Sequence, residues 1–131
     1  MRRISGLIAV LTIGVTALSC GGGGDSTGTG GGGGGGNCPA NTFCMTISNT
    51  FSPATLTVTV GTTVAWRNDA GIFHNVTWND AAGRNAAQAG DGTSDIAQFS
   101  SGSHTRLFNT TGTFGFKCTI HQGMNGTLTV Q

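Results

Sequence analysis

The stretch FGFKCTIHQGMNGTLTV, residues 114–130, places a thiol, an imidazole and a thioether within seven residues of one another. These side chains, Cys118, His121 and Met124, are spaced C-x-x-H-x-x-M in a segment otherwise made of strand-forming residues and glycine. Strand patterns on both sides predict a short loop that is anchored at both ends and presents all three groups together. Such a set of donors indicates a transition-metal site.

The residues on both sides of this loop alternate as β-strands do. In TFGFKC (113–118), Phe114, Phe116 and Cys118 fall on one face, so the thiol is predicted to point into the core. In GTLTV (126–130), which we predict to be the last strand, Leu128 and Val130 point inward.

The same alternation recurs earlier in TLTVTV (55–60), VAWRN (64–68) and HNVTW (74–78), with a turn at Gly61-Thr62 after the first of them. Strand signals begin at Phe43. The residues expected to face the core in this half of the domain are Met45, Leu56, Val58, Val60, Val64, Trp66, His74, Val76 and Trp78.

Residues 79–95 are small, polar and without a period, which predicts a long surface loop containing at most a short helical turn. IAQFSS (96–101) and HTRLFN (104–109) flank Ser101-Gly102-Ser103, and we predict a hairpin there. Seven or eight short strands with turns between them indicate an all-β fold of two packed sheets.

The N-terminal third does not resemble a folded domain. Residues 1–19 carry two arginines, an apolar run and then small residues, the layout of a secretory signal segment. A buried helix is the alternative, but the run is short for a membrane span and the glycines after it offer no packing partner. Cys20 stands where bacterial lipoproteins carry their acylated cysteine, whereas cleavage after Ala17 would release a soluble protein. Residues 20–36 then form a glycine-rich flexible linker, and residues 37–131 form one domain.

The charges of the domain cancel. Four cationic side chains oppose four carboxylates: Arg67, Arg84, Arg106 and Lys117 against Asp69, Asp80, Asp91 and Asp95. This balance gives no electrostatic reason to expect binding to nucleic acid or to an acidic membrane surface.

The four cysteines separate by position. Cys38 and Cys44 in CPANTFC are close enough to pair in an oxidising compartment, where so short a loop would contribute about 2 kcal/mol. If processing uses Cys20, Cys118 is left without a partner. A single thiol in an exported protein indicates a role beyond packing.

A metal at the C-terminal loop needs a further donor, and His74 is the candidate because it begins a strand on its core-facing side. Two imidazoles, a thiolate and a weak thioether form the ligand set of blue-copper electron-transfer sites. Zinc could use the nitrogen and thiolate donors, but thioether suits it poorly, so copper is favoured. His104 follows a Gly-Ser turn, where we expect solvent and no role as a ligand.

The segments FSPATLTVTVGTTVAWRN (51–68), HNVTW (74–78) and GTFGFKCTIHQGMNG (112–126) resemble the cupredoxins, especially the plastocyanin, pseudoazurin and amicyanin group. The resemblance implies a Greek-key β-sandwich that binds one type 1 copper through His74, Cys118, His121 and Met124. It also implies that Asn75 orients the ligand loops by hydrogen bonds. Two departures are the absence of tyrosine, with Phe114 and Phe116 at the aromatic positions, and the long loop 79–95, which has no counterpart.

The resemblance further implies a monomeric one-electron carrier, exported to the periplasm or cell envelope and tethered there, which meets redox proteins by transient contact. His121 is the expected exit for the electron. Loop residues that could form a docking patch are Ile72, Phe73, Ile120 and Gly123. A copper storage or delivery module is the alternative. An enzyme is not expected, because related copper oxidases and nitrite reductases need a second, histidine-rich copper centre and only His104 is left over.

Overall fold

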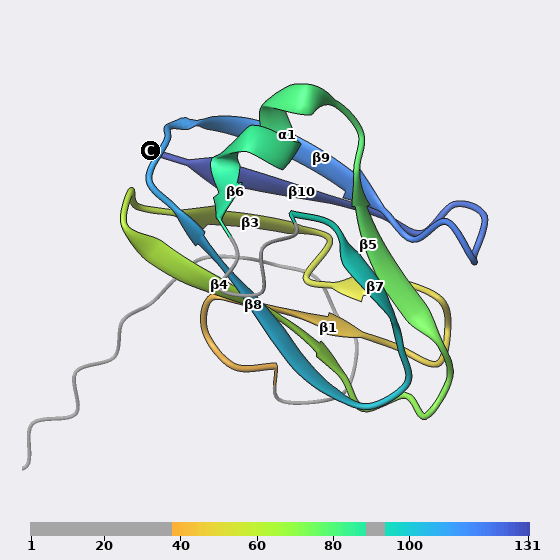
Figure 1. The fold of residues 1–131 in the computed structure, drawn as a ribbon. Helices are drawn as coiled ribbons and strands as arrows, with labels where there is room; N and C mark the ends of the chain where they lie inside the picture. The colour runs from red at the N-terminus through yellow and green to blue at the C-terminus, as the bar shows by residue number, and fades with distance from the viewer. Residues whose placement is uncertain (1–37, 89–93) are drawn as a thin grey trace, which may run out of the picture.

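The computed structural model describes residues 38–88 and 94–131 (Figure 1). The predicted signal segment, Cys20 and the glycine-rich linker lie outside the described residues. Within those residues, no helix is long and apolar enough to cross a lipid bilayer.

Two five-stranded sheets form a β-sandwich, as the alternating sequence pattern predicts (Figure 1). The first sheet has the order β2-β1-β4-β8-β6 and consists of β1 (Thr42–Met45), β2 (Phe51–Ser52), β4 (Thr62–Asn68), β6 (Ala87–Gln88) and β8 (Gly102–Phe108). The second has the order β3-β10-β9-β5-β7 and consists of β3 (Thr55–Val58), β5 (His74–Trp78), β7 (Ile96–Phe99), β9 (Gly112–Lys117) and β10 (Asn125–Val130).

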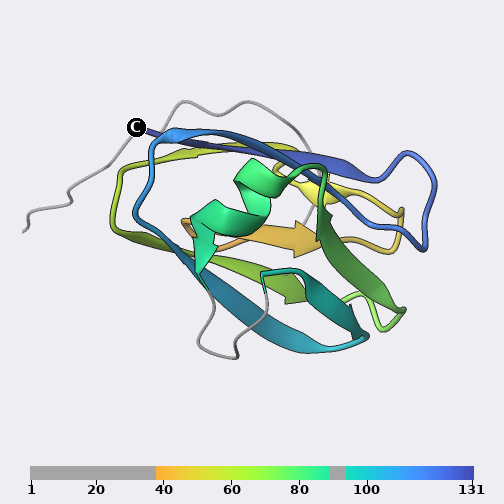
Figure 2. The same cartoon turned by 45° about the horizontal axis from the view of Figure 1, so that its top comes forward.

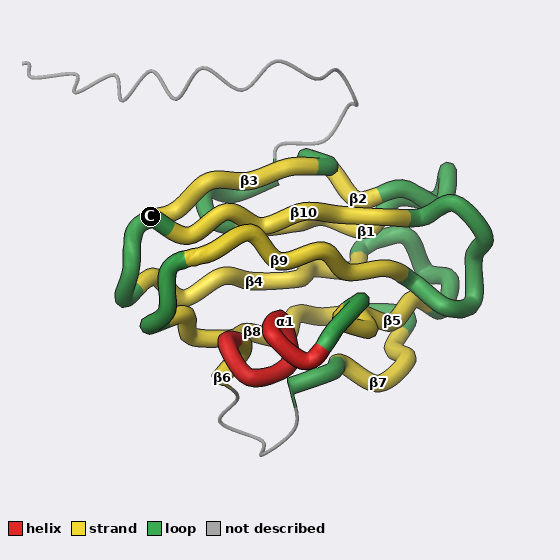
Figure 3. The backbone as a smooth tube through the Cα atoms, turned by 90° about the horizontal axis from the view of Figure 1, so that it is seen from above, coloured by secondary structure: helices red, strands yellow, loops and turns green. Residues whose placement is uncertain are grey.

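The described residues contain ten strands, against the seven or eight predicted, because β2 and β6 are pairs of residues too short to show a period. Seen from above, β3, β10 and β9 lie side by side in one layer (Figure 3). Parallel pairing joins β3 to β10 and β1 to β4, and the other pairs are antiparallel.

Aromatic rings fill the space between the sheets. Trp66 is fully buried, and its ring lies 5.5 Å from that of Phe116, 5.6 Å from that of Phe43 and 5.8 Å from that of Trp78. These rings come from β4, β9, β1 and β5, so the cluster connects both layers. The predicted core residues are buried in the structure, except for two positions on β3 and just beyond it.

Those two positions are Leu56, which is only half-buried, and Val60, which is 46% exposed. The prediction that Val60 faces the core is wrong. β3 ends at Val58, and beyond it the backbone N–H of Val60 donates to the carbonyl of Gln131, at the end of the chain. The alternation of TLTVTV therefore continues for two residues beyond the end of the strand.

The predicted hairpin around Ser101-Gly102-Ser103 is also wrong. β7 pairs with β5, whereas β8 pairs with β4 in the other sheet. Residues 100–101 thus carry the chain from one layer to the other, and Gly102 begins β8 with a φ of +90°. Periodicity located both strands, but it contains no information about which neighbour each one takes.

The long loop 79–95 contains helix α1 (Ala81–Ala86), in agreement with the expected helical turn. Asp80 caps this helix, since its Oδ1 accepts a hydrogen bond from the Gly83 N–H at 2.8 Å. The helix packs against β5, β6 and β9 and covers one side of the sandwich (Figure 2).

Three loops meet at one end of the sandwich. The loop that joins β9 to β10 lies opposite the C-terminus in both Figure 1 and Figure 2. The turn between β1 and β2 and the turn between β4 and β5 lie at the same end (Figure 1). The candidate ligands come from this end.

Candidate metal centre

The seven-residue loop from Cys118 to Met124 connects two adjacent antiparallel strands, β9 and β10. Lys117 lies opposite Asn125 where the strands open into the loop. The Cys118 N–H donates to the carbonyl of Met124 at 3.0 Å, and the Met124 N–H donates to the carbonyl of His121 at 3.3 Å. The backbone of the loop is therefore closed by its own hydrogen bonds, which fixes where its side chains can lie.

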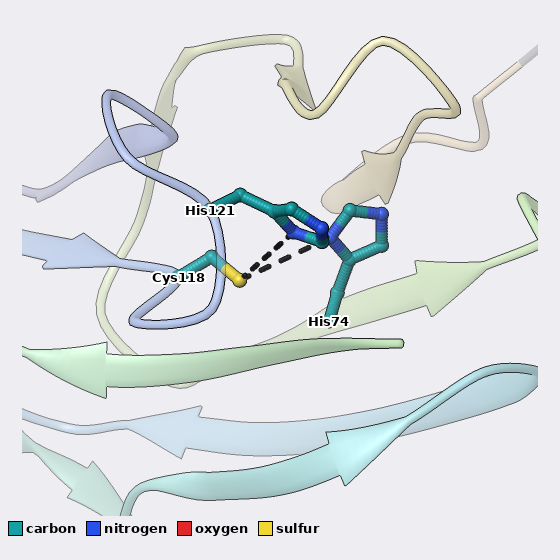
Figure 4. A group of neighbouring side chains, drawn as sticks. All are labelled: His74, Cys118 and His121. Carbon is teal, nitrogen blue, oxygen red and sulfur yellow. Dashed lines mark hydrogen bonds between the residues drawn. The ribbon is translucent and has the colours of Figure 1, made fainter. Parts of the chain in front are cut away.

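His74, the first residue of β5, meets two side chains of this loop (Figure 4). Cys118 Sγ lies 3.6 Å from His121 Nδ1 and 3.9 Å from His74 Nδ1, and the two Nδ1 atoms are 3.1 Å apart. Three donors that bind one ion at 2.0–2.3 Å in a plane would lie roughly 3.5–4 Å from one another. The observed triangle is close to that size, with the two nitrogens slightly nearer.

A hydrogen bond at Nε2 of His74 fixes the direction in which its Nδ1 points. Nε2 lies 3.2 Å from the carbonyl oxygen of Thr46, in the turn after β1. A carbonyl only accepts hydrogen bonds, so Nε2 carries the proton and donates it. Nδ1 then carries the lone pair and faces both the Cys118 sulfur and His121 Nδ1, which is the arrangement that a metal-ligating histidine requires.

His74 is also held in the neutral form that binds metals. Its side chain is fully buried, and desolvation by burial lowers its pKa below the ordinary value. The neighbouring His121 lowers the pKa further, while the hydrogen bond to Thr46 acts in the opposite direction. A neutral imidazole with a free lone pair needs no deprotonation before it coordinates an ion.

The three residues differ in exposure. His74 and Cys118 are buried, whereas His121 is half-buried and is the member of the trio nearest to solvent. Of the residues that the structure describes, these three form the one group of histidine, cysteine or carboxylate side chains close enough to share an ion.

Met124, the predicted fourth ligand, is buried at 1% exposure and takes part in both backbone hydrogen bonds of the loop. Asn75 bonds twice to Thr119: its Oδ1 accepts from the Thr119 N–H at 2.8 Å, and its Nδ2 donates to the Thr119 hydroxyl at 2.7 Å. These bonds tie β5 to the residue that follows Cys118, as the resemblance implied.

His104 lies outside the group, as predicted. Its ring is half-buried instead of being surrounded by solvent, because it packs at 4.5 Å against the edge of Phe99. Cys38 and Cys44, the pair expected at the start of the domain, form a disulfide with an S–S distance of 2.11 Å, which leaves Cys118 as the free cysteine of the described residues.

Sequence reasoning missed three residues that form hydrogen bonds around the site. The Thr46 carbonyl acts through the backbone, and no residue type signals such a role. Thr119 was overlooked although it follows Cys118 directly. Asn68 ends β4 with a buried amide, directly before the turn Asp69-Ala70-Gly71. An asparagine in this position often forms a hydrogen bond to the backbone of the turn, so the sequence did contain a signal for its role.

A family of known proteins matches most of the domain. The family described as copper binding proteins, plastocyanin/azurin family, matches residues 45–131. The chain belongs to this family. Copper is the metal of the family, and its chemistry fits the donors present: thiolate suits Cu(I), and imidazole suits copper in general. His74, Cys118 and His121 therefore form a site that could hold one copper ion.

Individual relatives agree with this assignment. Plastocyanin of Scenedesmus fuscus is 37% identical over 86 residues, which are 62% of this chain and 86% of that protein. A chloroplastic plastocyanin of Tetradesmus obliquus is 39% identical over 87 residues, which are 62% of this chain and 58% of that protein.

Solved cupredoxin structures share the fold. A purple cupredoxin from Nitrosopumilus maritimus superposes with a TM-score of 0.56 at 25% identity, covering 71% of this chain and all of that one. The reduced state of an amicyanin mutant superposes with a TM-score of 0.55 at 25% identity, covering 70% of this chain and 82% of that one. The all-β cupredoxin sandwich predicted from the sequence is confirmed.

Proposed function

We propose that this cupredoxin carries single electrons between redox proteins outside the cytoplasm, and that His74, Cys118, His121 and Met124 would hold its copper ion. The observation that carries the proposal is that the imidazole nitrogen of His74 on β5 meets the thiol and the imidazole nitrogen of a closed loop, with all three atoms within 3.9 Å of one another. Copper bound there would supply a couple between Cu(I) and Cu(II).

The protein contributes a donor set that has little freedom to move. The ring of His74 is fixed by Thr46, and the loop that carries Cys118 is tied to β5 through Asn75 and Thr119. Donors held in this way keep nearly the same positions in both oxidation states, so an electron can enter or leave with little rearrangement. Such preorganisation favours transfer over storage or delivery, in which the metal must leave.

The exposed side of the centre fits brief contact with another protein. His121 is half-buried, and the large apolar side chains nearby are exposed: Ile47 at 74%, Phe73 at 55% and Ile120 at 43%. They come from the three loops at the end of the sandwich where the candidate ligands lie. Ile47 was not among the residues predicted for docking, and we add it to that patch. Exposed apolar side chains grouped around a partly exposed ligand suit a small docking surface for a redox partner.

A carrier, and not an enzyme, is the role we assign. The copper oxidases and nitrite reductases of related fold require a further group of histidines, and His104 is the one histidine left over in the sequence. We further propose that residues 1–19 direct export and that acylated Cys20 tethers the domain through the glycine-rich linker. The disulfide Cys38–Cys44 supports export, because disulfides persist in oxidising compartments.

The function is tested by loading the purified domain with copper and measuring electron self-exchange between its Cu(I) and Cu(II) forms by nuclear magnetic resonance. A carrier should exchange rapidly and should retain Cu(I) in the presence of a chelator. Phe73→Ser, which alters the exposed patch without touching a ligand, should slow the exchange and leave the visible spectrum unchanged. Slow exchange together with ready loss of Cu(I) to the chelator would identify a delivery protein instead.

A further inference from the structure

We infer that Asn68 is a positioning residue for the copper centre: its buried amide holds the turn before His74 and the strand opposite His74, so that the imidazole meets the loop Cys118–Met124. This inference rests on the copper site proposed above. Asn68 contacts no ligand, and it would act through the backbone that carries His74.

Asn68 ends β4, and its side chain is fully buried with every hydrogen-bonding position of the amide nitrogen in use. Nδ2 donates to the carbonyl of Ile72 at 2.9 Å and to the carbonyl of Phe99 at 2.7 Å. Oδ1 accepts from the N–H of Ala70 at 3.0 Å. An amide nitrogen has two N–H groups, so both donors are satisfied.

The partners of Asn68 lie on either side of His74. Ile72 precedes His74 by two residues, in the turn that leads into β5. Phe99 lies directly opposite His74 in the pairing of β5 with β7. A single side chain from the first sheet therefore holds both the turn that leads into His74 and the neighbouring strand β7 of the second sheet.

The strand ladder alone gives His74 weak support. The pairing of β5 with β7 shifts register between His74 and Val76, and the pairing of β5 with β9 includes Thr77 and Trp78 but not His74. Gly71, with a φ of +73°, lies in the turn just before, where the backbone has no regular partner. The Asn68 amide supplies the fixed bonds that the ladder lacks at this residue.

The consequence for the metal site follows from the distances. His74 Nδ1 lies 3.9 Å from Cys118 Sγ and 3.1 Å from His121 Nδ1. A shift of about one ångström in the backbone of His74 would change these distances enough that the three donors could no longer bind the same ion. Residues that orient metal ligands typically change metal affinity or activity by 10- to 100-fold when they are replaced. We assign Asn68 an effect of that order.

The test replaces Asn68 by serine. Serine can still accept the Ala70 N–H but is too short to reach the carbonyls of Ile72 and Phe99. We expect Cu(II) affinity to fall on the order of tenfold or more, with a changed reduction potential and a changed paramagnetic resonance spectrum. In the metal-free protein, hydrogen exchange at the His74 amide should accelerate, while the Ala70 amide, whose acceptor serine keeps, should change less; this reports the loosened backbone without any copper.

The matched control is Phe108→Leu, at the opposite end of the same strand pair. β4 pairs with β8 from Thr62 opposite Phe108 to Asn68 opposite Gly102, and Phe108 is fully buried. This variant should lose stability and leave the affinity, potential and spectrum as they are in the wild type. If Asn68→Ser fails to fold, Asn68→Thr serves, because it keeps an acceptor oxygen, fills more of the buried space and is likewise too short to reach the two carbonyls.

The inference is overturned if the serine variant binds copper with wild-type affinity, potential and spectrum, or if both variants change the copper site alike, which would mark a general effect of lost stability. A wild-type protein without a blue-copper spectrum would instead overturn the proposed function and this inference with it.

Discussion

Two connections between strands, the loop Cys118–Met124 and the segment 79–95, are held in different ways. The first joins neighbouring antiparallel strands and is closed by hydrogen bonds of its own backbone. The second leads from β5 to β7 and depends on distant side chains: Arg106 on β8 donates to the carbonyl of Ser94 at 3.0 Å and to that of Asp95 at 2.8 Å.

Because of this difference, the short loop should determine metal binding and the long segment should determine the stability of the fold. The short loop presents two of the three metal donors in a geometry set by its own backbone bonds and by the two bonds between Thr119 and Asn75, so changes in the segment 79–95 should affect it little. The long segment contributes no residue to the donor group that the structure describes. Helix α1 of this segment covers one side of the sandwich, and Trp78 Nε1 donates to the carbonyl of Ser94 at 3.0 Å. Substitutions in the two connections should therefore produce opposite phenotypes.

The largest effect on the metal is expected from Cys118→Ser. A hydroxyl cannot replace the thiolate that gives a blue-copper site its intense absorption, so the band should disappear from the copper-loaded protein. The free energy of unfolding of the metal-free protein should change little, since the replacement is nearly isosteric. Visible spectra and urea unfolding check both expectations. A band that persists in the variant would remove Cys118 from the site.

The largest effect on stability is expected from Arg106→Met. Arg106 is 2% exposed, and its replacement removes the hydrogen bonds that the guanidinium donates to the carbonyls of Ser94, Asp95 and Thr105. We expect the free energy of unfolding to fall by about 3 kcal/mol, with the copper spectrum unchanged in the folded protein. Lys117→Met, which removes an exposed cation, is the control and should cost less than about 0.5 kcal/mol. A spectrum altered by Arg106→Met would show that the two regions are coupled.

A smaller loss is expected from Asp80→Ala, which removes the N-cap of α1. The N–H of Gly83 loses its acceptor, and caps of this kind contribute about 1 kcal/mol. Urea unfolding should show this loss, while Asp80→Asn, which keeps an acceptor oxygen, should recover most of it. Equal losses in both variants would argue that the charge of Asp80, and not its capping bond, stabilises the segment.

The smallest effect is expected from Asn125→Ala, next to the metal-binding loop. Asn125 Nδ2 donates to the carbonyl of Gly123 at 3.1 Å, but the side chain is exposed and the loop is already closed by backbone bonds. The free energy of unfolding should change by less than about 0.5 kcal/mol, and copper affinity should stay within twofold or so. A large loss of affinity would show that the loop depends on this side chain.

The same difference explains which features the sequence could predict. The loop Cys118–Met124 was predictable because its donors, its strands and its turn are contiguous, so spacing alone implies that they lie together. The contribution of His74 was predictable from its place at the start of a strand and on the core-facing side. The orientation of its ring was not, because the Thr46 carbonyl that holds it lies 28 residues away in the chain and belongs to the backbone.

Strand pairing was the other feature that the alternating sequence pattern could not predict. The alternation in residues 96–109 gave two strands correctly, yet they belong to different sheets, since a turn of two residues can cross the sandwich as easily as it can reverse a strand. The alternation at 55–60 likewise extended past the end of β3, which left Val60 in solvent. Only the contacts of each strand with its neighbours decide these cases.

The most direct test of the metal site is X-ray absorption fine structure at the copper edge of the wild-type domain loaded with one equivalent of copper. We expect one short bond to sulfur and two bonds to imidazole nitrogen in the first coordination shell. A shell composed of nitrogen and oxygen alone would contradict it, because it would place the ion away from Cys118.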